Sequence, residues 1–354
     1  METQQKINPI WQKKDVVGVD IGSGSMKFVQ LEKKGKLTKL VGYGKVEIPE
    51  NFIIEGIIAE PEKLAETTKK YLEEGVWGKV TATRVCTSLP ESKIFTRTIT
   101  LPHLQDKALE EAINWEISQT IPMAMTDLYV DWKVIGPSED DPKNDEIIYA
   151  AAPKAIVDAY IQFFSVLGWE IEGIETSLTA IVRSVVTKKK NKEAVLVIDI
   201  GSQATNLAIY DRLIRLTGST LIGGDHITTR IADALKVDLK EAEKIKKQKT
   251  ADQASIREAI DVEVNEITKE ATKMINYYHE KNKKSAPISR IILCGGGASL
   301  STLTDIFSEK LGIPAEIGNP WANISIYPLK SVPKEEAPTY TNAVGLALLG
   351  VIND

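Results

Sequence analysis

The sequence predicts an α/β protein of two lobes, and three observations support this fold class. The chain has 354 residues, which is long for one domain. An apolar segment that runs into Asp-x-Gly-Ser occurs twice, at residues 16–25 and 195–204. A third apolar segment, residues 290–294, runs into three consecutive glycines. We therefore expect each lobe to open on one copy of the same strand–turn–strand unit.

The composition argues against several classes of protein. The net charge is −5, so nothing predicts a nucleic-acid partner. Cys86 and Cys294 lie in apolar surroundings, which indicates reduced core residues of a cytoplasmic protein and neither a disulfide framework nor a metal cluster. The N-terminal residues are polar, and no stretch approaches the roughly 20 apolar residues of a membrane helix. We expect no signal peptide and no direct membrane span.

The duplicated turn has the chemistry of a phosphate site. Four positions are shared by the two copies: Asp20 and Asp199, Ile21 and Ile200, Gly22 and Gly201, Ser23 and Ser202. The glycines let a ligand approach the backbone closely, and successive N–H groups in such a turn form an anion-binding concavity. Lys27 adds a positive charge, and the two aspartates are suited to holding hydrated magnesium. A plain hairpin turn is the alternative for either copy alone.

Two further segments are candidates for contacts with a nucleotide. Gly295–Gly297 could lie beneath a flat nucleoside or could form a strained junction between a loop and a helix. Glu243 and Lys246 share one helix face and could contact a ligand or form a surface ion pair. No Gly-Lys-Ser/Thr follows a glycine loop, so the chain has no P-loop. The duplicated turn leads into a strand and not a helix, which excludes a dinucleotide fingerprint.

These segments together resemble the actin, Hsp70 and sugar-kinase superfamily, in which two ribonuclease-H-like lobes close on ATP. The resemblance implies that ATP and Mg²⁺ are the cofactors, with Asp20 and Asp199 at the metal. It assigns the first phosphate loop to Gly22, Ser23, Gly24, Ser25 and Lys27, and the second to Gly201, Ser202, Gln203, Thr205 and Asn206. It places Glu243, Lys246 and Thr250 at the ribose and base. It also places Gly224 and Asp225 beside the sugar and phosphates, and Gly295, Gly296, Gly297 and Ser299 at the adenosine.

The chain departs from the superfamily pattern at two places. Gln203-Ala204 stands where many members have glycine or an acid, which suggests a looser second phosphate loop. Glu175 matches a glutamate that orients the attacking water in the superfamily, but the proline that commonly follows it is Thr176 here. The resemblance thus implies ATP binding and leaves open whether the chain hydrolyses ATP slowly.

An inserted segment resembles one family within this superfamily. Residues 107–119 have the pattern of an amphipathic helix, residues 127–132 of a strand and residues 138–145 of a charged hairpin tip, and residues 147–152 complete the segment and return to the lobe. Together with Leu101-Pro102, Ile121-Pro122 and Gly223-Gly224-Asp225, this segment is similar to the PilM family of type IV pilus assembly, in the FtsA and PilM branch of actin-like proteins.

This resemblance implies an actin-like fold with a small α+β subdomain inserted in the first lobe. We assign residues 15–84, 151–190 and 339–354 to the first lobe core and residues 85–150 to the inserted subdomain. The second lobe core takes residues 191–222 and 285–338, and residues 223–284 form its own small subdomain.

The PilM resemblance also implies a role. Members bind the N-terminal cytoplasmic segment of the membrane protein PilN in a groove of the first lobe, which links PilN to pilus motor components at the inner face of the membrane. The alternatives are an FtsA-like filament-forming protein, for which self-association is expected, a type II secretion L-like cytoplasmic protein, and a kinase or vigorous ATPase. No second acidic motif suggests a kinase.

Overall fold

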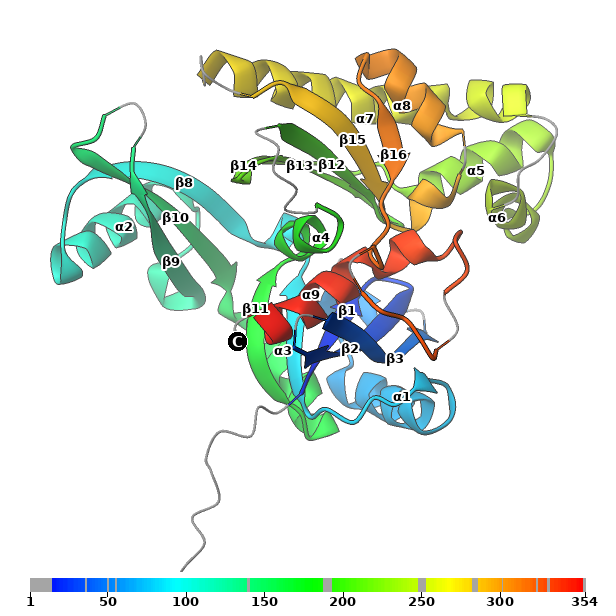
Figure 1. Ribbon diagram of the computed structural model, residues 1–354, viewed down its shortest axis with the longest axis horizontal. Helices are drawn as coiled ribbons and strands as arrows, with labels where there is room; N and C mark the ends of the chain where they lie inside the picture. The colour runs from blue at the N-terminus through cyan, green and yellow to red at the C-terminus, as the bar shows by residue number, and fades with distance from the viewer. Residues whose placement is uncertain are drawn as a thin grey trace, which may run out of the picture.

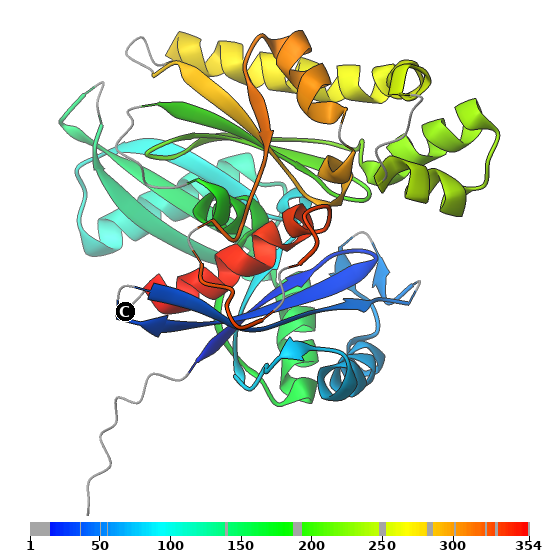
Figure 2. The same ribbon diagram turned by 45° about the vertical axis from the view of Figure 1, so that its right-hand side comes forward.

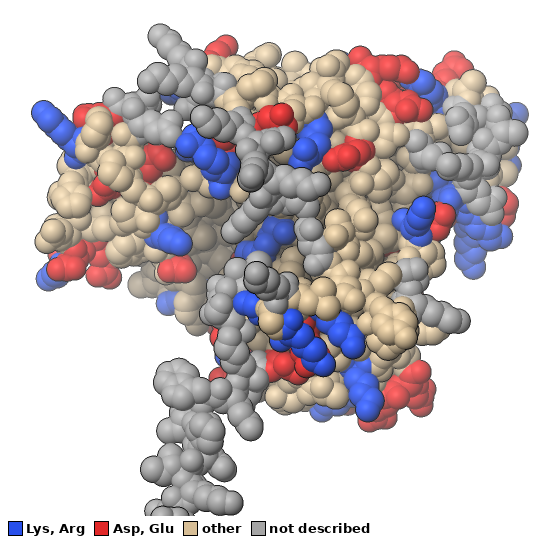
Figure 3. All heavy atoms as spheres, viewed as in Figure 1, with Lys and Arg blue, Asp and Glu red and all other residues tan. Residues whose placement is uncertain are grey.

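The computed structural model describes residues 15–35, 37–49, 51–54, 56–138, 141–186, 193–247, 253–281, 286–300, 302–322, 324–329 and 332–352. Two lobes lie one above the other, and a small subdomain projects to one side of them (Figure 1). Among the described residues, no helix is long and apolar enough to cross a bilayer. Lys, Arg, Asp and Glu side chains are mixed over the face drawn in Figure 3.

The first lobe is built on a six-stranded sheet in the order β11-β7-β1-β2-β3-β6. Its strands are β1 (Val16–Ile21), β2 (Ser25–Lys34), β3 (Leu37–Glu47), β6 (Trp77–Gly78), β7 (Arg84–Leu89) and β11 (Glu170–Thr176). β1, β2 and β3 are antiparallel neighbours, whereas β7 runs parallel to both β1 and β11. A short hairpin of β4 (Ile53–Ile54) and β5 (Ile57–Ile58) follows β3.

The second lobe repeats this arrangement, as the duplicated sequence predicts. Its sheet has the order β14-β13-β12-β15-β16, with β12 (Ala194–Ile200), β13 (Thr205–Asp211), β14 (Leu213–Thr220), β15 (Ile288–Cys294) and β16 (Ala315–Ile317). Three antiparallel strands are again followed by two parallel ones. β12 therefore corresponds to β1, β15 to β7 and β16 to β11, so the ends of β1 and β12 are equivalent points in the two lobes.

Helices cover the outer face of each sheet. In the first lobe, α1 (Pro61–Glu74) and α3 (Lys154–Leu167) pack on one apolar face of β1, β2 and β7. In the second lobe, α5 (Gly224–Leu235), α6 (Leu239–Lys247), α7 (Gln253–Lys281) and α8 (Leu303–Leu311) share one core with β12, β13 and β15. These cores fix the sheets, and thereby the turns at the strand ends.

Two helices lie between the sheets (Figure 2). α4 (Ser177–Val185) packs its apolar side on the inner face of the second sheet, and α9 (Thr341–Ile352) covers the inner face of the first. The helices cross so closely that a Cβ atom on Gly345 would lie 1.8 Å from the carbonyl oxygen of Ala180. A Cβ on Gly18 of β1 would lie 2.2 Å from the carbonyl oxygen of Ala343 in α9. Glycine is required at both points because main chain meets main chain.

The small subdomain is a three-stranded sheet covered by one helix. The strand order is β8-β10-β9, with β8 (Phe95–Pro102), β9 (Leu128–Pro137) and β10 (Asn144–Pro153). α2 (Asp106–Thr120) packs Leu109, Ile113 and Ile117 against Ile147 and Tyr149 of β10. The helix predicted at residues 107–119 and the strand predicted at residues 127–132 are therefore confirmed, and both β8 and β9 are edge strands.

Two predicted domain boundaries differ from the structure. β7 pairs with β1, so residues 84–89 belong to the first sheet, and the small subdomain begins with β8 and not at residue 85. The chain also returns to the first lobe before residue 339, because Ile324 and Val332 are buried against β2, β3 and α9. Both differences arise from pairing with distant segments, which a local pattern does not report. Short 3₁₀ turns complete the chain: η1 (Glu91–Lys93), η2 (Met125–Asp127), η3 (Gly296–Ser299) and η4 (Ala337–Tyr340).

We predict that Gly345→Ala destabilises the protein by about 2 kcal/mol or more. The same change in an unpacked helix would stabilise it by about 1 kcal/mol, so the sign reports the crossing of α4 and α9. Urea unfolding checks this expectation. Gly173→Ala is the control, because its Cβ would meet only Leu349 Cδ2 and Cys86 Sγ at ordinary distances of 3.6 and 3.8 Å. Equal stability of the two variants would contradict the close crossing.

Candidate functional site

The two duplicated turns meet where the lobes face each other. Each is closed by an equivalent hydrogen bond: Gly22 N donates to Ser25 O at 3.0 Å, and Gly201 N donates to Ala204 O at 2.9 Å. The hydroxyl oxygens of Ser23 and Ser202 are 2.6 Å apart, although the residues are 179 positions apart in the chain. The sequence repeat thus becomes one site with a wall from each lobe.

A group of polar side chains lies beneath the first turn. Asp20 and Lys27 are opposite each other in the β1–β2 ladder, with Lys27 Nζ 3.6 Å from Asp20 Oδ2. Asn342, at the start of α9, donates from Nδ2 to Asp20 Oδ1 at 2.8 Å and to Ser88 Oγ at 2.9 Å. Its amide oxygen is buried and has no hydrogen-bond partner among the described residues. Asp20 is therefore held by both β2 and α9.

Asp199 is the equivalent carboxylate of the second lobe. Burial and the charge of Asp20 raise the pKa of Asp199, Lys27 opposes both effects, and the resulting pKa is about 7. The carboxylates of Asp20 and Asp199 thus repel each other across the lobe interface, and the charge of Lys27 offsets part of this repulsion. Such a group favours a bound cation or a bound proton.

Three backbone segments of the second lobe converge beside Asp199. Gly224 N donates to Gly201 O at 2.7 Å and Asp225 N donates to Ser202 O at 2.9 Å, so the start of α5 rests on the second turn. Gly295 has a φ of +80°, and a Cβ there would lie 2.6 Å from Asp199 Oδ1. Only glycine fits this position, because the backbone conformation and the contact both exclude a side chain.

α6 is tied to the start of α5 by a buried lysine. Lys246 is 4% exposed, and its Nζ lies 2.6 Å from Glu243 Oε2 and 3.1 Å from Gly224 O. Thr228 bridges the pair with hydrogen bonds to both side chains. Burial opposes ionisation of Glu243, but hydrogen bonds from Lys246, Thr228 and Lys247 lower its pKa overall. Glu243 and Lys246 form an ion pair, and this pair lies at the candidate site.

Not every predicted residue faces the site. Thr205 is fully buried and donates to Ile222 O at 2.7 Å, so we correct its assignment from phosphate contact to structural residue. Thr250 lies outside the described residues. Asn206 stands opposite Asp199 in the ladder, and Gln203 is exposed at the turn. Ser299 donates to the carbonyl oxygen of Glu335 at 2.9 Å.

Glu175 is engaged elsewhere. Both of its oxygens accept hydrogen bonds from Arg183, at 2.5 and 2.6 Å, and Arg183 also donates to Gly345 O in α9. A carboxylate bound on both oxygens by a guanidinium is a poor acceptor for the proton of a water. The predicted role of Glu175 in orienting an attacking water is therefore not supported by this arrangement, which joins β11 to α4 and α9.

The sequence reasoning missed two polar residues of the site. Asn342 was overlooked because it lies in a segment that otherwise has the composition of a core helix. Glu91 was overlooked because it follows β7 in a segment with no glycine signal. Burial raises the pKa of Glu91, a hydrogen bond from the Leu178 backbone opposes this, the charge of Asp199 adds to it, and the resulting pKa is about 7. The sequence signal that could have identified Glu91 is its position directly after an apolar strand that lies next to the repeated turn.

A magnesium ion fits the site only together with a ligand. Among the described residues, no three His, Cys, Asp or Glu side chains are placed to hold a metal by themselves. Asp20 and Asp199 would accept hydrogen bonds from the waters of a magnesium that phosphates bring with them, which is how Mg²⁺ is commonly bound. This arrangement agrees with the paired carboxylates.

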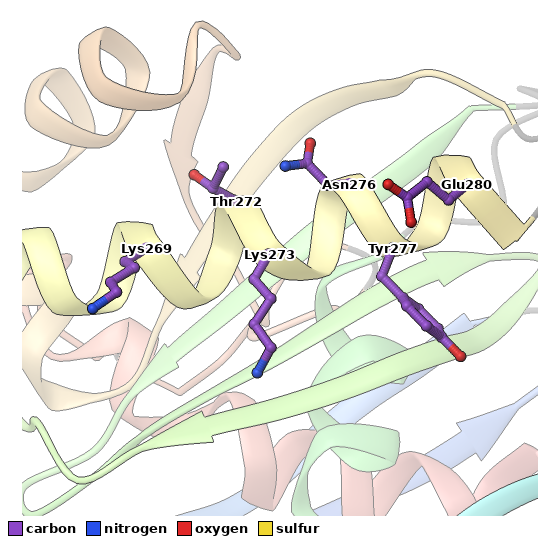
Figure 4. A pocket seen from close by; sticks show the side chains of 6 residues that line it. All are labelled: Lys269, Thr272, Lys273, Asn276, Tyr277 and Glu280. Carbon is purple, nitrogen blue, oxygen red and sulfur yellow. The ribbon is translucent and has the colours of Figure 1, made fainter.

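One surface hollow lies away from these turns. It has a volume of about 560 Å³ and is lined by Lys269, Thr272, Lys273, Asn276, Tyr277 and Glu280. All six belong to α7, and their side chains project from the helix without converging on a common point (Figure 4). A binding site needs polar groups that converge, so we take the meeting turns and not this hollow as the candidate site.

The duplicated sheets and the meeting turns define an actin-like protein. One family's sequence model, described as "Type IV pilus assembly protein PilM", matches residues 18–351. The chain therefore belongs to the PilM family.

Solved structures and a curated relative agree with this class. A structure described as "PilM-PilN type IV pilus biogenesis complex" aligns with a TM-score of 0.81 and 24% identity, covering 96% of this chain and 99% of that one. MreB5 of Spiroplasma citri, solved with AMPPNP, aligns with a TM-score of 0.57 and 12% identity, covering 97% of both chains. Cell division protein FtsA of Pseudomonas aeruginosa is 27% identical over 207 residues, which are 52% of this chain. The match spans 48%, about half, of the FtsA sequence.

We predict that Asp199→Asn stabilises the nucleotide-free protein at pH 8 but not at pH 4. The folded-state pKa of about 7 lies above the roughly 4 of an unfolded chain. The folded protein therefore holds the proton more tightly, and the carboxyl's contribution to stability falls as the pH rises from 4 to 7. Removing the charge should raise the free energy of unfolding at pH 8 by about 1–3 kcal/mol.

Urea unfolding at both pH values tests this prediction. Asp233→Asn in α5 is the control, because Asp233 is exposed and undergoes the same change of side chain. A gain of the same size at pH 4 and pH 8, or a loss at pH 8, would show that Asp199 is not a destabilising charge in the free protein.

Proposed function

We propose that this protein is a nucleotide-binding adaptor of type IV pilus assembly. ATP lies between its lobes, and the first lobe docks the N-terminal cytoplasmic segment of a PilN-like membrane protein. Membership of the PilM family supports the assembly role. The observation that carries nucleotide binding is the meeting of two equivalent glycine-serine turns at Ser23 and Ser202. Through its partner the protein is held at the inner face of the membrane.

The phosphates are proposed to lie between the two turns. Main-chain N–H groups of Ser23, Gly24 and Ser202 and the hydroxyls of Ser23, Ser25 and Ser202 would surround them, and Lys27 would contribute a positive charge. A phosphate in this position would replace the contact between Ser23 and Ser202, and each serine would then contact the phosphate. Asp20 and Asp199 would then hold the water shell of magnesium, which relieves the repulsion between the two carboxylates.

The nucleoside is proposed to lie on the third glycine turn. A Cβ on Gly296 would meet only Thr339 Cγ2 within 4 Å, at 3.9 Å, so one side of this turn is open. The Glu243–Lys246 pair holds the start of α5 next to Gly297, where a ribose would lie. The proposal requires binding and not turnover, because the residue expected to orient water, Glu175, is bound by Arg183.

The partner segment is proposed to dock where the small subdomain joins the first lobe. Tyr129, at the start of the edge strand β9, donates to Asp158 of α3 at 3.1 Å and lies beneath the Lys154 ammonium at 5.5 Å. Tyr129 and Ile161 are both 45% exposed, and Ile161 lies one turn beyond Asp158 on α3. An apolar extended segment can cover these side chains and pair with the free edge of β9.

A contact between the lobes supports coupling of the two sites. Arg215 of β14 lies 3.6 Å from Glu146 of β10, so the second lobe touches the small subdomain directly. A nucleotide that changes how closely the lobes approach would move this contact, and with it the subdomain that carries Tyr129. We propose that ATP tunes docking in this way, by favouring one of two lobe arrangements.

We predict that Lys27→Ala and Asp20→Ala each weaken ATP binding at least tenfold. Each change removes a charge that faces the proposed phosphates or their magnesium. Isothermal titration with Mg-ATP measures the effect, and circular dichroism confirms that the variants are folded. The control is Lys45→Ala, because Lys45 stands opposite Lys27 on β3 and pairs with Glu47 at the surface. Unchanged affinity in both Lys27→Ala and Asp20→Ala would remove the phosphate site.

We predict that Ile161→Asp weakens binding of the PilN-like N-terminal peptide at least tenfold. A charge at this exposed position opposes the burial of an apolar segment. Fluorescence anisotropy of a labelled synthetic peptide measures the affinity. The control is Val262→Asp on α7, where an equally radical change falls on a side chain that is 62% exposed in the other lobe. Equal affinities of the two variants would place the docking site elsewhere.

A further inference from the structure

Glu91 in the first lobe occupies the position that corresponds to Gly296 of the third glycine turn in the second lobe. η1 begins with Glu91 just beyond β7, and η3 begins with Gly296 just beyond β15. Because β7 and β15 are equivalent strands, these 3₁₀ turns are equivalent points on the two walls of the site. A ligand that crosses from lobe to lobe with its nucleoside on η3 extends its other end toward η1. That end is the terminal phosphate.

The side chain of Glu91 is only partly satisfied in the free protein. Its carboxyl group accepts a hydrogen bond from the backbone N–H of Leu178, the second residue of α4. The other oxygen, Oε2, is buried and has no hydrogen-bond partner among the described residues. A buried acceptor without a partner costs about 1–3 kcal/mol, which is unusual unless a ligand or a proton compensates.

Glu91 has charged neighbours on two other elements. Asp199 of β12 is near enough to act on its charge. Glu91 and Arg97 of β8 also line a hollow of about 220 Å³ that the edge of β14 closes with Thr217–Ser219. Glu91 thus borders this hollow and is also influenced by the carboxylate at the end of β12. A role in the hollow is the competing explanation for its free oxygen.

We propose that Glu91 faces the terminal phosphate of the bound nucleotide and sets the preference between ATP and ADP, an inference that rests on the nucleotide-binding function proposed above. At a pH above its pKa of about 7, the buried Glu91 side chain is ionised and repels a terminal phosphate strongly, because little water screens the two charges. ADP ends one phosphate earlier and escapes most of this repulsion. Glu91 therefore weakens ATP relative to ADP, and it favours return to the ADP or free form.

The test is the ratio of the ADP and ATP dissociation constants in Glu91→Gln and in wild-type protein. Titration calorimetry of the full chain with each Mg-nucleotide supplies both constants. We expect the dissociation constant of ADP divided by that of ATP to be about tenfold higher in Glu91→Gln than in wild-type protein, which corresponds to about 1.4 kcal/mol in favour of ATP. The control is Glu110→Gln, an exposed residue of α2 that undergoes the same loss of charge and should leave the ratio unchanged.

The outcomes separate this inference from the function on which it rests. If wild-type protein binds neither nucleotide, the nucleotide-binding function fails and takes the inference with it. If wild-type protein binds both and Glu91→Gln leaves the ratio unchanged, the inference alone is overturned and the free oxygen belongs to the hollow. If Glu91→Gln does not fold, the ratio of the two dissociation constants is measured in Glu91→Ala, which also removes the charge.

Discussion

Two carboxylates at equivalent strand ends, Asp20 and Asp199, constrain the rest of this structure. They act on each other across the interface between the lobes, and Lys27 is the lysine that opposes their combined charge. Burial and mutual repulsion raise the pKa of Asp199, so the free protein holds a charge arrangement that a cation would relieve. The serine contact at the turns brings the lobes together at this same point. This arrangement supports the proposal that the site binds a ligand that brings positive charge together with phosphate oxygens.

The helices between the sheets connect this point to the remainder of the molecule. Asn342 binds Asp20 and is the second residue of α9, the helix that covers the inner face of the first sheet. α9 crosses α4 with no room for a side chain at Gly345, and α4 packs on the second sheet. A displacement at Asp20 is thus transmitted through rigid, closely packed elements. The contact of Arg215 with Glu146 extends this path to the small subdomain.

Local sequence patterns predicted the features that depend on neighbouring residues, which are the tight turns, the helices and the short-range side-chain pairs. The repeat predicted the two turns and the aspartates at their strand ends, and the glycine run predicted the third turn, because only particular residues satisfy such tight backbone. The periodicity of residues 107–119 predicted α2, which spans Asp106–Thr120. The residue types also predicted the Glu243–Lys246 pair, although the contacts of Lys246 with Gly224 and Thr228 depend on the packing of α6 against α5.

The errors concern residues whose surroundings come from distant parts of the chain. Glu175 matched a sequence position, yet Arg183 and α9 determine what its oxygens contact. Thr205 looked like a loop hydroxyl, but Ile222 binds it inside the core. Glu91 and Asn342 have no motif, and they matter only because β7 ends and α9 begins beside β1. The boundary at residue 85 failed for the same reason, since the pairing of β7 with β1 spans more than sixty residues.

The most direct test of the central claim is amide hydrogen exchange of the two turns with and without Mg-ATP. We expect slower exchange at residues 23–25 and at residues 202–204 together, because the phosphates engage main-chain N–H groups from both lobes. Slowing in one turn alone, or in neither turn while the nucleotide is bound, would contradict a site shared by the two lobes.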